Sequence, residues 1–416
     1  MKIKLKMLNT IMLSIFLSMT IRNRARLRSL FMNPTKDLIL FVVSPEDFNT
    51  PSEIGRYPDK VFSLHKIVLE MGLKSEIIFH PWVSTKRNLN FIRVLRVESF
   101  VSSLKKYWTI QRSQHKSSRE NKFYTWWSSL SLLEKYQFSI WSDFLDKTKP
   151  LAILGIDLKE YLVVASKLEN IPVVEVMHGV FTNESIPLKR YSRGSYQIVP
   201  VDLFLSWDSH YSNLIEAVNI PTITLGHPNE HYSSYLPFEF NFHDGNILVT
   251  LSWGVENSFD PFGMLHMNLA DKLLLLGGEL SKLVFRLHPV AYEQNRNRMK
   301  YVTNWFQKNF PGSNLSTPKE TSLFDELSNA RLHITDGSSS FYEAGLLGVP
   351  TIFTSLRAYN DTPQEYKSKG QIYLWKDAED VNLFTLTSGK RVTQGCNLDR
   401  EKFKEVINNF QIAISS

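Results

Sequence analysis

Apolar residues along this chain form short runs that alternate with stretches of helical periodicity. LILFVV at 38–43 is a continuous apolar run and predicts a buried strand. From 151 to 225, the runs LAILGI, IPVVEVM and VDLFLSW are separated by segments in which apolar residues recur at helical spacing. Strand, helix and strand in this order form βαβ units, and the strands of such units share one parallel sheet.

A second series of the same kind follows an irregular segment. Residues 226–245 are rich in Pro, Gly, Asn and His, have neither period and therefore predict a linker. Beyond this linker, the runs NILVTLSW, KLVFRL, RLHIT and VPTIF again alternate with helical periodicity. We predict an α/β fold of two doubly wound, Rossmann-like domains that face each other, with a ligand between the carboxyl ends of their strands. The expected boundaries are 1–35 for an N-terminal segment, 36–230 for the first domain, 245–395 for the second and 396–416 for a C-terminal helix.

The N-terminal segment combines basic and apolar residues. Between Lys6 and Arg22 lies an apolar stretch of 15 residues. As a helix it would span about 22 Å, less than the roughly 30 Å of a bilayer core. RNRARLR follows it in place of the small residues of a signal-peptide cleavage site. One interpretation is a segment that lies on an anionic membrane surface, and the other is an N-terminal extension or a first core helix.

The net charge of +7 is concentrated at this end of the chain. Seven of the 48 basic residues lie among the first 30 residues, which contain no acidic residue, so the rest of the chain is formally neutral. This distribution argues against nucleic acid as a partner. The single cysteine, Cys396, cannot form an internal disulfide and argues against dithiol redox chemistry.

The sequence also lacks the usual motifs of metal and nucleotide sites. It contains no Asp-x-Asp, no G-x-x-x-x-G-K-[ST] loop, no G-x-G-x-x-G and no zinc-type cluster of Cys and His. We therefore expect neither a metal nor a cofactor, and any phosphate would be held by helix termini, imidazole and guanidinium groups.

Residues 331–355, RLHITDGSSSFYEAGLLGVPTIFTS, form the strongest local signal. A strand is followed by a polar turn and a helix, where backbone N–H groups favour phosphate and Ser338, Ser339 and Ser340 add hydroxyls. Glu343, one turn further on, suits the hydroxyls of a ribose. The alternative is a capping box, because Ser340 and Glu343 have its spacing and would then only satisfy backbone N–H groups.

Two histidines follow predicted strands. His288 precedes a proline after KLVFRL, so an extended backbone would project its imidazole beyond the sheet, with Arg286 nearby as a second phosphate ligand. The alternative for His288 is a solvated loop histidine. His178, in MHGV after the strand IPVVEVM, would lie at the cleft and could act as a general base, or could simply end the strand.

Taken together, these motifs resemble a known enzyme group. His-Gly in the first domain, and H-P, D-x-S-S, E-A and G-x-P in the second, resemble bacterial surface-polysaccharide transferases of the GT-B fold. That group includes capsule and lipopolysaccharide glycosyltransferases that use CMP-activated sialic acid or Kdo, and CDP-glycerol polyol-phosphate transferases. The resemblance covers roughly residues 150–355. It implies that His288, Ser338 and Ser339 hold the donor phosphate and that His178 is the base; Asp157 is the nearest match to the acidic motif of sialyltransferases and competes for that role.

The expected function is therefore glycosyl transfer from a CMP- or UDP-sugar to a capsule or lipopolysaccharide acceptor, which is a glycan or a lipid-linked glycan. The second domain would bind the donor, the first domain the acceptor, and the protein would lie in the cytoplasm on the inner face of the cell membrane. The alternatives are a CDP-glycerol-type polyol-phosphate transferase, a nucleotide-sugar 2-epimerase that needs no acceptor, and a non-catalytic assembly protein that keeps the fold.

Overall fold

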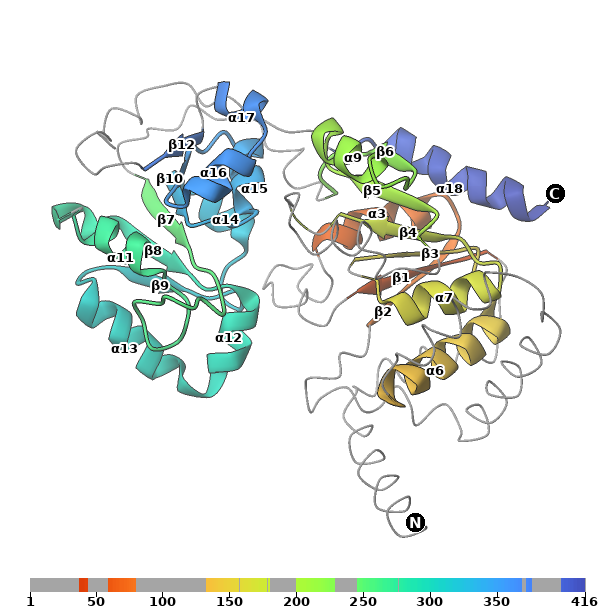
Figure 1. The fold of residues 1–416 in the computed structure, drawn as a ribbon, viewed down its shortest axis with the longest axis horizontal. Helices are drawn as coiled ribbons and strands as arrows, with labels where there is room; N and C mark the ends of the chain where they lie inside the picture. Colours follow the sequence, from red (N-terminus) through yellow and green to blue (C-terminus); the bar gives the residue numbers. More distant parts are fainter. Residues whose placement is uncertain are drawn as a thin grey trace, which may run out of the picture.

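The chain folds into two α/β domains, each built on a parallel sheet (Figure 1). The computed structural model describes residues 37–43, 59–79, 132–156, 158–177, 179, 200–228, 245–275, 277–368, 372–375 and 398–415. Each described sheet has six strands, and every strand pair in both sheets is parallel. The prediction of two doubly wound, Rossmann-like domains is confirmed.

The first sheet has the strand order β2-β1-β3-β4-β5-β6. Its central strands read as apolar runs because helices cover both faces of a doubly wound sheet, and all six residues of LILFVV are buried. The strands are β1 (Leu38–Val43), β2 (Lys74–Phe79), β3 (Ala152–Gly155), β4 (Val173–Val176), β5 (Leu203–Ser206) and β6 (Thr222–Thr224). The helices described between them are α3 (Asp59–Glu70), α6 (Leu132–Thr148), α7 (Glu160–Leu168) and α9 (Ser209–Glu216).

The second sheet has the order β12-β11-β10-β7-β8-β9. The chain leaves β7 toward β8 and β9 and then returns to the other side of β7 with β10, so the direction of strand addition switches between β7 and β10. Ligands of such sheets bind at the carboxyl ends of the strands beside this switch. The strands are β7 (Asn246–Thr250), β8 (Leu283–Arg286), β9 (Asn314–Ser316), β10 (Ala330–Thr335), β11 (Thr351–Phe353) and β12 (Ile372–Leu374).

Short helices connect these strands. The α-helices are α11 (Met267–Leu274), α12 (Pro289–Asn295), α13 (Met299–Asn309), α14 (Leu323–Ser328), α15 (Ser340–Leu346), α16 (Leu356–Asp361) and α17 (Gln364–Ser368). Two 3₁₀ helices, η4 (Gly277–Lys282) and η5 (Arg296–Arg298), complete the described connections.

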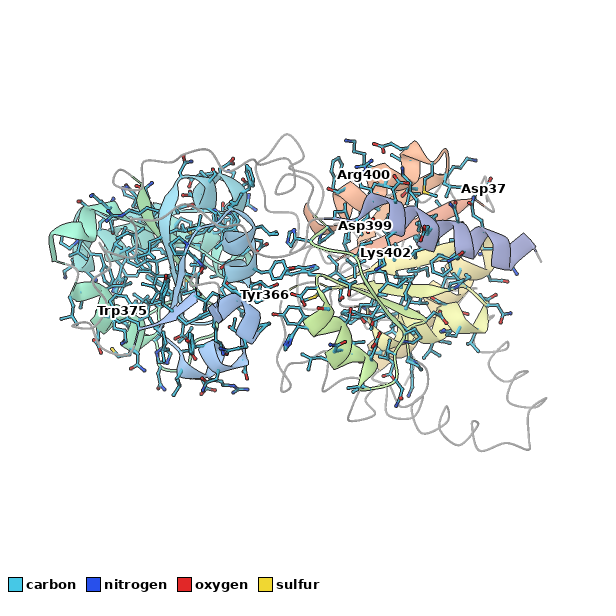
Figure 2. The ribbon with its side chains drawn as sticks, turned by 90° about the horizontal axis from the view of Figure 1, so that it is seen from above. Asp37, Tyr366, Trp375, Asp399, Arg400 and Lys402 are labelled. Atoms are coloured by element: carbon cyan, nitrogen blue, oxygen red, sulfur yellow. The ribbon has the colours of Figure 1, made fainter. Side chains whose placement is uncertain are left out.

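The C-terminal helix α18 (Arg400–Ser415) returns to the first domain (Figure 2). Asp399 N donates to Leu225 O at 2.8 Å, and Arg400 pairs with Glu70 of α3. Phe403 and Ile407 are fully buried in the same core cluster as β1. The helix therefore ties the end of the chain to the first sheet.

The two domains pack directly against each other. Trp207 of the first domain and Tyr342 of the second lie in one hydrophobic cluster with ring centroids 5.1 Å apart, and the Tyr342 hydroxyl donates to Trp207 O at 3.2 Å. The Tyr366 hydroxyl donates to Asp208 Oδ2 at 2.6 Å, and Figure 2 shows Tyr366 where the domains meet. These contacts fix the carboxyl ends of the two sheets relative to each other.

The N-terminal segment 1–35 lies outside the described residues. In the part of the chain that the structure does describe, no helix combines the length and apolar character required to cross a bilayer.

Candidate functional site

The polar turn after β10, residues 336–339 and here called the serine turn, lies at the carboxyl edge of the second sheet, beside the switch between β7 and β10. Thr335 Oγ1 accepts hydrogen bonds from Gly337 N at 3.3 Å and from Ser338 N at 3.0 Å, which folds the chain sharply at the strand end. Ser338 and Ser339 are partly exposed, so their hydroxyls can reach a ligand.

Ser340 is buried beneath this turn. It is 4% exposed, and its hydroxyl donates to Ser338 Oγ at 2.9 Å. The capping box that its spacing suggested is not formed: the N-cap of α15 is Ser339, which makes no side-chain capping hydrogen bond. The role of Ser340 in this structure is therefore to support Ser338 from below.

His288 lies at the same edge, just past the end of β8. It is the N-cap of α12, and its backbone is extended with φ −63° and ψ 141°, as the following proline predicts. Its Nδ1 accepts a hydrogen bond from Val290 N at 3.2 Å. A neutral imidazole that accepts at Nδ1 carries its hydrogen on Nε2, so His288 is set up to donate from Nε2 to an anionic oxygen.

Trp253, which the sequence analysis missed, stands beside His288. Its side chain is 51% exposed, and its ring centroid lies 6.1 Å from that of His288 with a tilt of 33°. β7 lies between β10 and β8 in the sheet, so the loop that carries Trp253 lies between the serine turn and His288. The signal was present in the sequence, since Trp253 follows the apolar run of β7 and precedes Gly254, which has φ +65°.

The loop that carries Trp253 is held by the buried carboxylate of Asp260. This group accepts hydrogen bonds from Phe262 N at 2.8 Å, Met264 N at 3.0 Å and Leu265 N at 2.5 Å, and from the Ser258 hydroxyl at 2.7 Å. These hydrogen bonds hold the segment 258–265 of the loop in one conformation. The exposed indole of Trp253 therefore projects from a loop that is stabilised by its own polar contacts.

The side chain of Arg286 extends toward β9, on the opposite side of β8 from β7. Its guanidinium is buried and donates to Ser316 Oγ at 3.1 Å, to Thr321 Oγ1 at 2.9 Å and to Thr321 O at 3.0 Å. These contacts lie toward β9, whereas the serine turn lies beyond β7. The structure thus does not bring the guanidinium of Arg286 together with Ser338 and Ser339.

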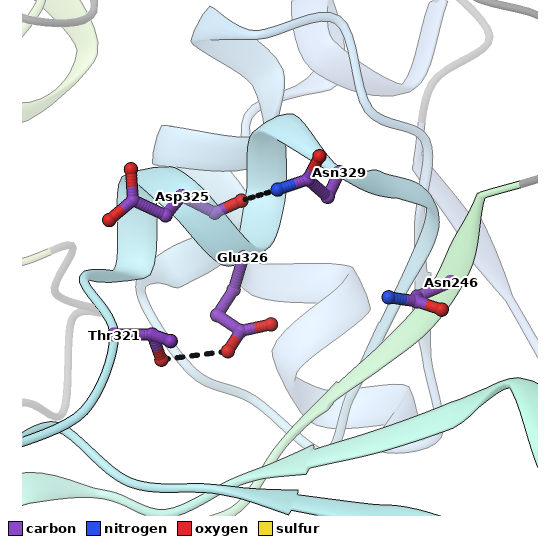
Figure 3. Close-up of a pocket in the computed structure, with 5 residues that line it drawn as sticks. All are labelled: Asn246, Thr321, Asp325, Glu326 and Asn329. Carbon is purple, nitrogen blue, oxygen red and sulfur yellow. Dashed lines mark hydrogen bonds between the residues drawn. The ribbon is translucent and has the colours of Figure 1, made fainter.

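A polar pocket of about 330 Å³ borders the same Thr321 (Figure 3). Its other lining residues are Asn246, Asp325, Glu326 and Asn329. Thr321 Oγ1 donates to Glu326 Oε1 at 2.7 Å, and Asn329 Nδ2 donates to Asp325 O at 2.8 Å. Asn246 begins β7 and Asn329 precedes β10, so this pocket extends to the amino ends of these strands, away from the serine turn.

Glu343 lies at the boundary between the domains. It is 6% exposed, and its Oε1 lies 3.7 Å from Nε2 of His227 in the first domain. The His227 ring stacks on Tyr342 at 6.1 Å and packs against Trp207 at 4.6 Å. The carboxylate predicted to bind a ribose thus lies one helical turn behind the serine turn and beside the first domain.

The end of β4 reaches the serine turn from the first domain. A Cβ added to Gly179 would lie 3.0 Å from Ser339 Oγ and 3.2 Å from Ser339 Cβ, so the chain at Gly179 lies directly against the Ser339 side chain and a larger residue here would displace it. The predicted catalytic residues His178 and Asp157 lie outside the described residues, while their chain neighbours Gly179 and Ile156 lie within them. Among the described residues, no cluster of three or more His, Cys, Asp or Glu could hold a metal ion.

The comparisons with known proteins identify the fold. No family model matches the chain, and no curated protein matches it. Solved structures do: UDP-GlcNAc 2-epimerase of Neisseria meningitidis bound to UDP-GlcNAc has a TM-score of 0.54 at 14% identity, over 90% of this chain and 99% of that chain. The Methanocaldococcus jannaschii enzyme in complex with UDP-GlcNAc and UDP has a TM-score of 0.53 at 13% identity, over 90% and 99%. UDP-N-acetylglucosamine 2-epimerase from Rickettsia bellii has a TM-score of 0.52 at 12% identity, over 90% of this chain and 96% of that chain. This chain therefore has the two-domain, GT-B-type fold of these proteins.

Proposed function

We propose that this chain is an enzyme that acts on a nucleotide sugar, with the phosphates of the ligand bound at the serine turn. The observation that carries the proposal is the approach of Gly179 to Ser339. A ligand whose phosphates contact the serine turn would have its sugar beside the end of β4, where the carboxyl ends of both sheets meet. Ligands of doubly wound sheets bind at such edges.

The proposed phosphate ligands are hydroxyl and imidazole groups. Ser338 and Ser339 would donate hydroxyl hydrogens to phosphate oxygens, and His288 would donate from Nε2. Hydrogen bonds to charged oxygens are roughly twice as strong as those between neutral groups. Glu343 would accept hydrogen bonds from ribose hydroxyls. Arg286, two residues before His288 at the end of β8, would act on the phosphates only through its positive charge. In this proposal the side chains hold the phosphates without a metal ion.

The first reaction that we propose is 2-epimerisation of the nucleotide sugar. The solved structures that share this fold include UDP-GlcNAc 2-epimerases bound to UDP-GlcNAc and UDP, which supports a UDP-sugar as the ligand. Inversion at carbon 2 requires removal of its proton on one face, and the electron pair left behind would form a C1–C2 double bond while the C1–O bond to UDP breaks. Return of a proton to the other face of carbon 2, as the C1–O bond to UDP re-forms, would complete the inversion. His178 and Asp157, which neighbour Gly179 and Ile156 in sequence, are the candidate groups for these proton transfers.

The second candidate reaction is transfer of the sugar, or of a polyol phosphate, to a surface glycan. The His-Gly, H-P and D-x-S-S motifs of the sequence favour it. In this case His178 or Asp157 would remove a proton from an acceptor hydroxyl, and the acceptor would be a capsule or lipopolysaccharide glycan or its lipid-linked form. The basic N-terminal segment would then hold the enzyme on the cytoplasmic face of the membrane.

Incubation with UDP-GlcNAc in D₂O without acceptor distinguishes the two reactions. Epimerisation predicts formation of the 2-epimer with deuterium at carbon 2, detected by NMR. Transfer predicts neither the epimer nor the deuterium, and it predicts a glycosylated product only when an acceptor is added. Nucleotide binding itself is tested by thermal shift with CMP, CDP, UMP, UDP and GDP. A ligand at 100 times its dissociation constant stabilises the fold by about 2.7 kcal/mol. No shift with any of these nucleotides would contradict the proposal.

A further inference from the structure

A buried histidine of the second sheet lies directly under the serine turn. His333 of β10 is fully buried, and three hydroxyls from different elements surround its ring. Nδ1 lies 3.0 Å from Thr351 Oγ1 of β11. Nε2 lies 3.0 Å from Thr250 Oγ1 of β7 and 3.2 Å from Ser340 Oγ of α15.

The hydrogen of the Ser340 hydroxyl has a defined direction. This hydroxyl has one hydrogen, and the geometry assigns it to Ser338 Oγ at 2.9 Å. Ser338 Oγ also accepts from Ser340 N at 3.3 Å, so both of its acceptor positions are used. The hydrogen of the Ser338 hydroxyl is therefore directed away from Ser340, toward the exposed side of the turn.

The same count of hydrogens favours one tautomer of His333. If Nε2 carries the hydrogen, Thr351 donates to Nδ1, Nε2 donates toward Thr250 and Ser340, and Thr250 donates to Ser340 at 3.2 Å. The one hydrogen on Nε2 is then shared between Thr250 and Ser340, and each of the other contacts has a hydrogen of its own. If Nδ1 carries the hydrogen, the single hydrogen of Thr250 points to Nε2, and Ser340 receives none from either neighbour. The arrangement that satisfies all buried groups is the Nε2–H tautomer.

We propose that His333 is a positioning residue that polarises this hydroxyl chain, so that Ser338 presents its hydrogen to an anionic oxygen. The hydrogen bonds run in one direction, from Thr351 through His333 and Ser340 to Ser338, and chains of this kind strengthen one another. The role rests on the proposed function, since the anion is the phosphate of the nucleotide sugar. Desolvation supports it, because burial lowers the pKa of His333 to about 3 and keeps the ring neutral.

The tautomer can be measured without any ligand. The ¹⁵N NMR shifts of a protein labelled at histidine distinguish the protonated from the unprotonated ring nitrogen, and comparison with His333→Gln assigns the His333 signals. We expect the hydrogen on Nε2 at pH 7. A hydrogen on Nδ1, or a doubly protonated ring, would overturn the proposal.

The consequence is tested with UDP and inorganic pyrophosphate, by calorimetric titration of the full-length protein. We expect His333→Leu and Ser340→Ala to weaken both ligands by about 10- to 100-fold, the range for one hydrogen bond to a charged group. His333→Gln, which restores a donor near the position of Nε2, should recover most of the affinity. Thr351→Val should weaken binding less, since it removes only the far end of the hydroxyl chain. Thr148→Val is the matched control, because its buried hydroxyl donates to Phe144 O at 2.8 Å within α6 of the first domain.

A double-mutant cycle separates positioning from a general loss of structure. Because His333 acts through Ser338, adding His333→Leu to Ser338→Ala should cause no further loss of affinity. Additive losses, or wild-type affinity in both His333→Leu and Ser340→Ala, would overturn the proposal; if His333→Leu does not fold, Ser340→Ala and Thr351→Val carry the same test. Binding of pyrophosphate without any nucleotide preference would instead contradict the proposed function and leave the role of His333 standing. A wild-type protein that binds neither ligand would contradict both.

Discussion

At the residue scale, the candidate site depends on side chains whose chemistry is set by their immediate neighbours. His288 is a donor because Val290 N occupies its Nδ1, and Ser338 is a donor because Ser340 occupies its acceptor positions. Neither property follows from the residue type alone, since imidazole and hydroxyl groups both donate and accept. The contacts therefore leave both groups as donors, which is what the proposed anion site requires.

Trp253 provides the first test at this scale. We expect Trp253→Leu to weaken UDP-GlcNAc binding by several fold, because the exposed indole beside His288 can stack on a ring of the ligand, and aromatic pairs contribute about 0.5–1.5 kcal/mol. Trp253→Phe should retain most of the affinity. Calorimetric titration measures both variants, and Leu356→Ala, at an exposed apolar side chain of α16, serves as a surface control. Equal affinity in Trp253→Leu and wild type would show that the ligand does not contact the indole.

His333 gives a pH-dependent prediction. Its pKa is lowered to about 3 in the folded protein by burial, which the charge of Glu343 only partly opposes. The unfolded chain binds a proton near pH 6.5, so the stability that the neutral ring provides is present above that pH and is lost as the pH falls toward 3. Between pH 7 and 5, urea unfolding of the wild type should lose about 2 kcal/mol more than that of His333→Gln. An identical pH profile of the two proteins would contradict the buried, neutral ring.

At the scale of elements, the sequence was a good guide to the strands and a poor one to their side-chain networks. β1 and β8 read as strands because buried parallel strands are continuous apolar runs. The hydrogen-bond chain through His333 could not be predicted from such runs. Thr250, His333 and Thr351 belong to three strands, and they meet only because β7, β10 and β11 are neighbours in the sheet.

The capping box illustrates the same limit. Ser340 and Glu343 have the right spacing, yet tertiary contacts with His333 and Thr250 engage the Ser340 hydroxyl. Ser322 and Asp325 at the start of α14 do form a capping box, with Asp325 N donating to Ser322 Oγ at 3.0 Å. Local spacing is thus decisive only where no buried neighbour competes for the side chain.

Ser322 supplies the prediction at this scale. We expect Ser322→Ala to lower the free energy of unfolding by about 1 kcal/mol through loss of the cap. The affinity for UDP should stay at the wild-type value, because the Ser322 side chain makes its hydrogen bonds to Asp325, within α14. Urea unfolding and calorimetric titration measure the two quantities. A loss of affinity as large as that of Ser338→Ala would show that the assigned site is wrong.

At the scale of the whole molecule, buried polar contacts hold the two domains in one arrangement. Tyr366 donates to Asp208 Oδ2 while Asp208 Oδ1 caps α9 by accepting from Tyr211 N. Burial raises the pKa of Tyr366, and the nearby charge of Asp208 adds to the shift, so the hydroxyl stays protonated and remains a donor. The two-domain architecture was predictable from the two strand series, but this interface was not, because its partners are 158 positions apart in the chain.

Tyr366→Phe tests the interface. We expect the free energy of unfolding to fall by about 1–3 kcal/mol, because the substitution leaves a buried carboxylate without one of its donors. Hydrogen exchange should accelerate in α9 and α17. Tyr301→Phe, at a side chain that is 59% exposed, is the control and should leave both measurements unchanged. Wild-type stability in Tyr366→Phe would mean that the bond to Asp208 contributes nothing to domain packing.

The central claim is that hydroxyl and imidazole groups at the serine turn bind the phosphates of a nucleotide sugar. A crystal structure of the protein with UDP-GlcNAc tests it most directly. We predict phosphate oxygens within hydrogen-bonding distance of Ser338, Ser339 and His288, with the sugar beside Gly179. Ligand density at any other place, with the serine turn empty, would contradict the account.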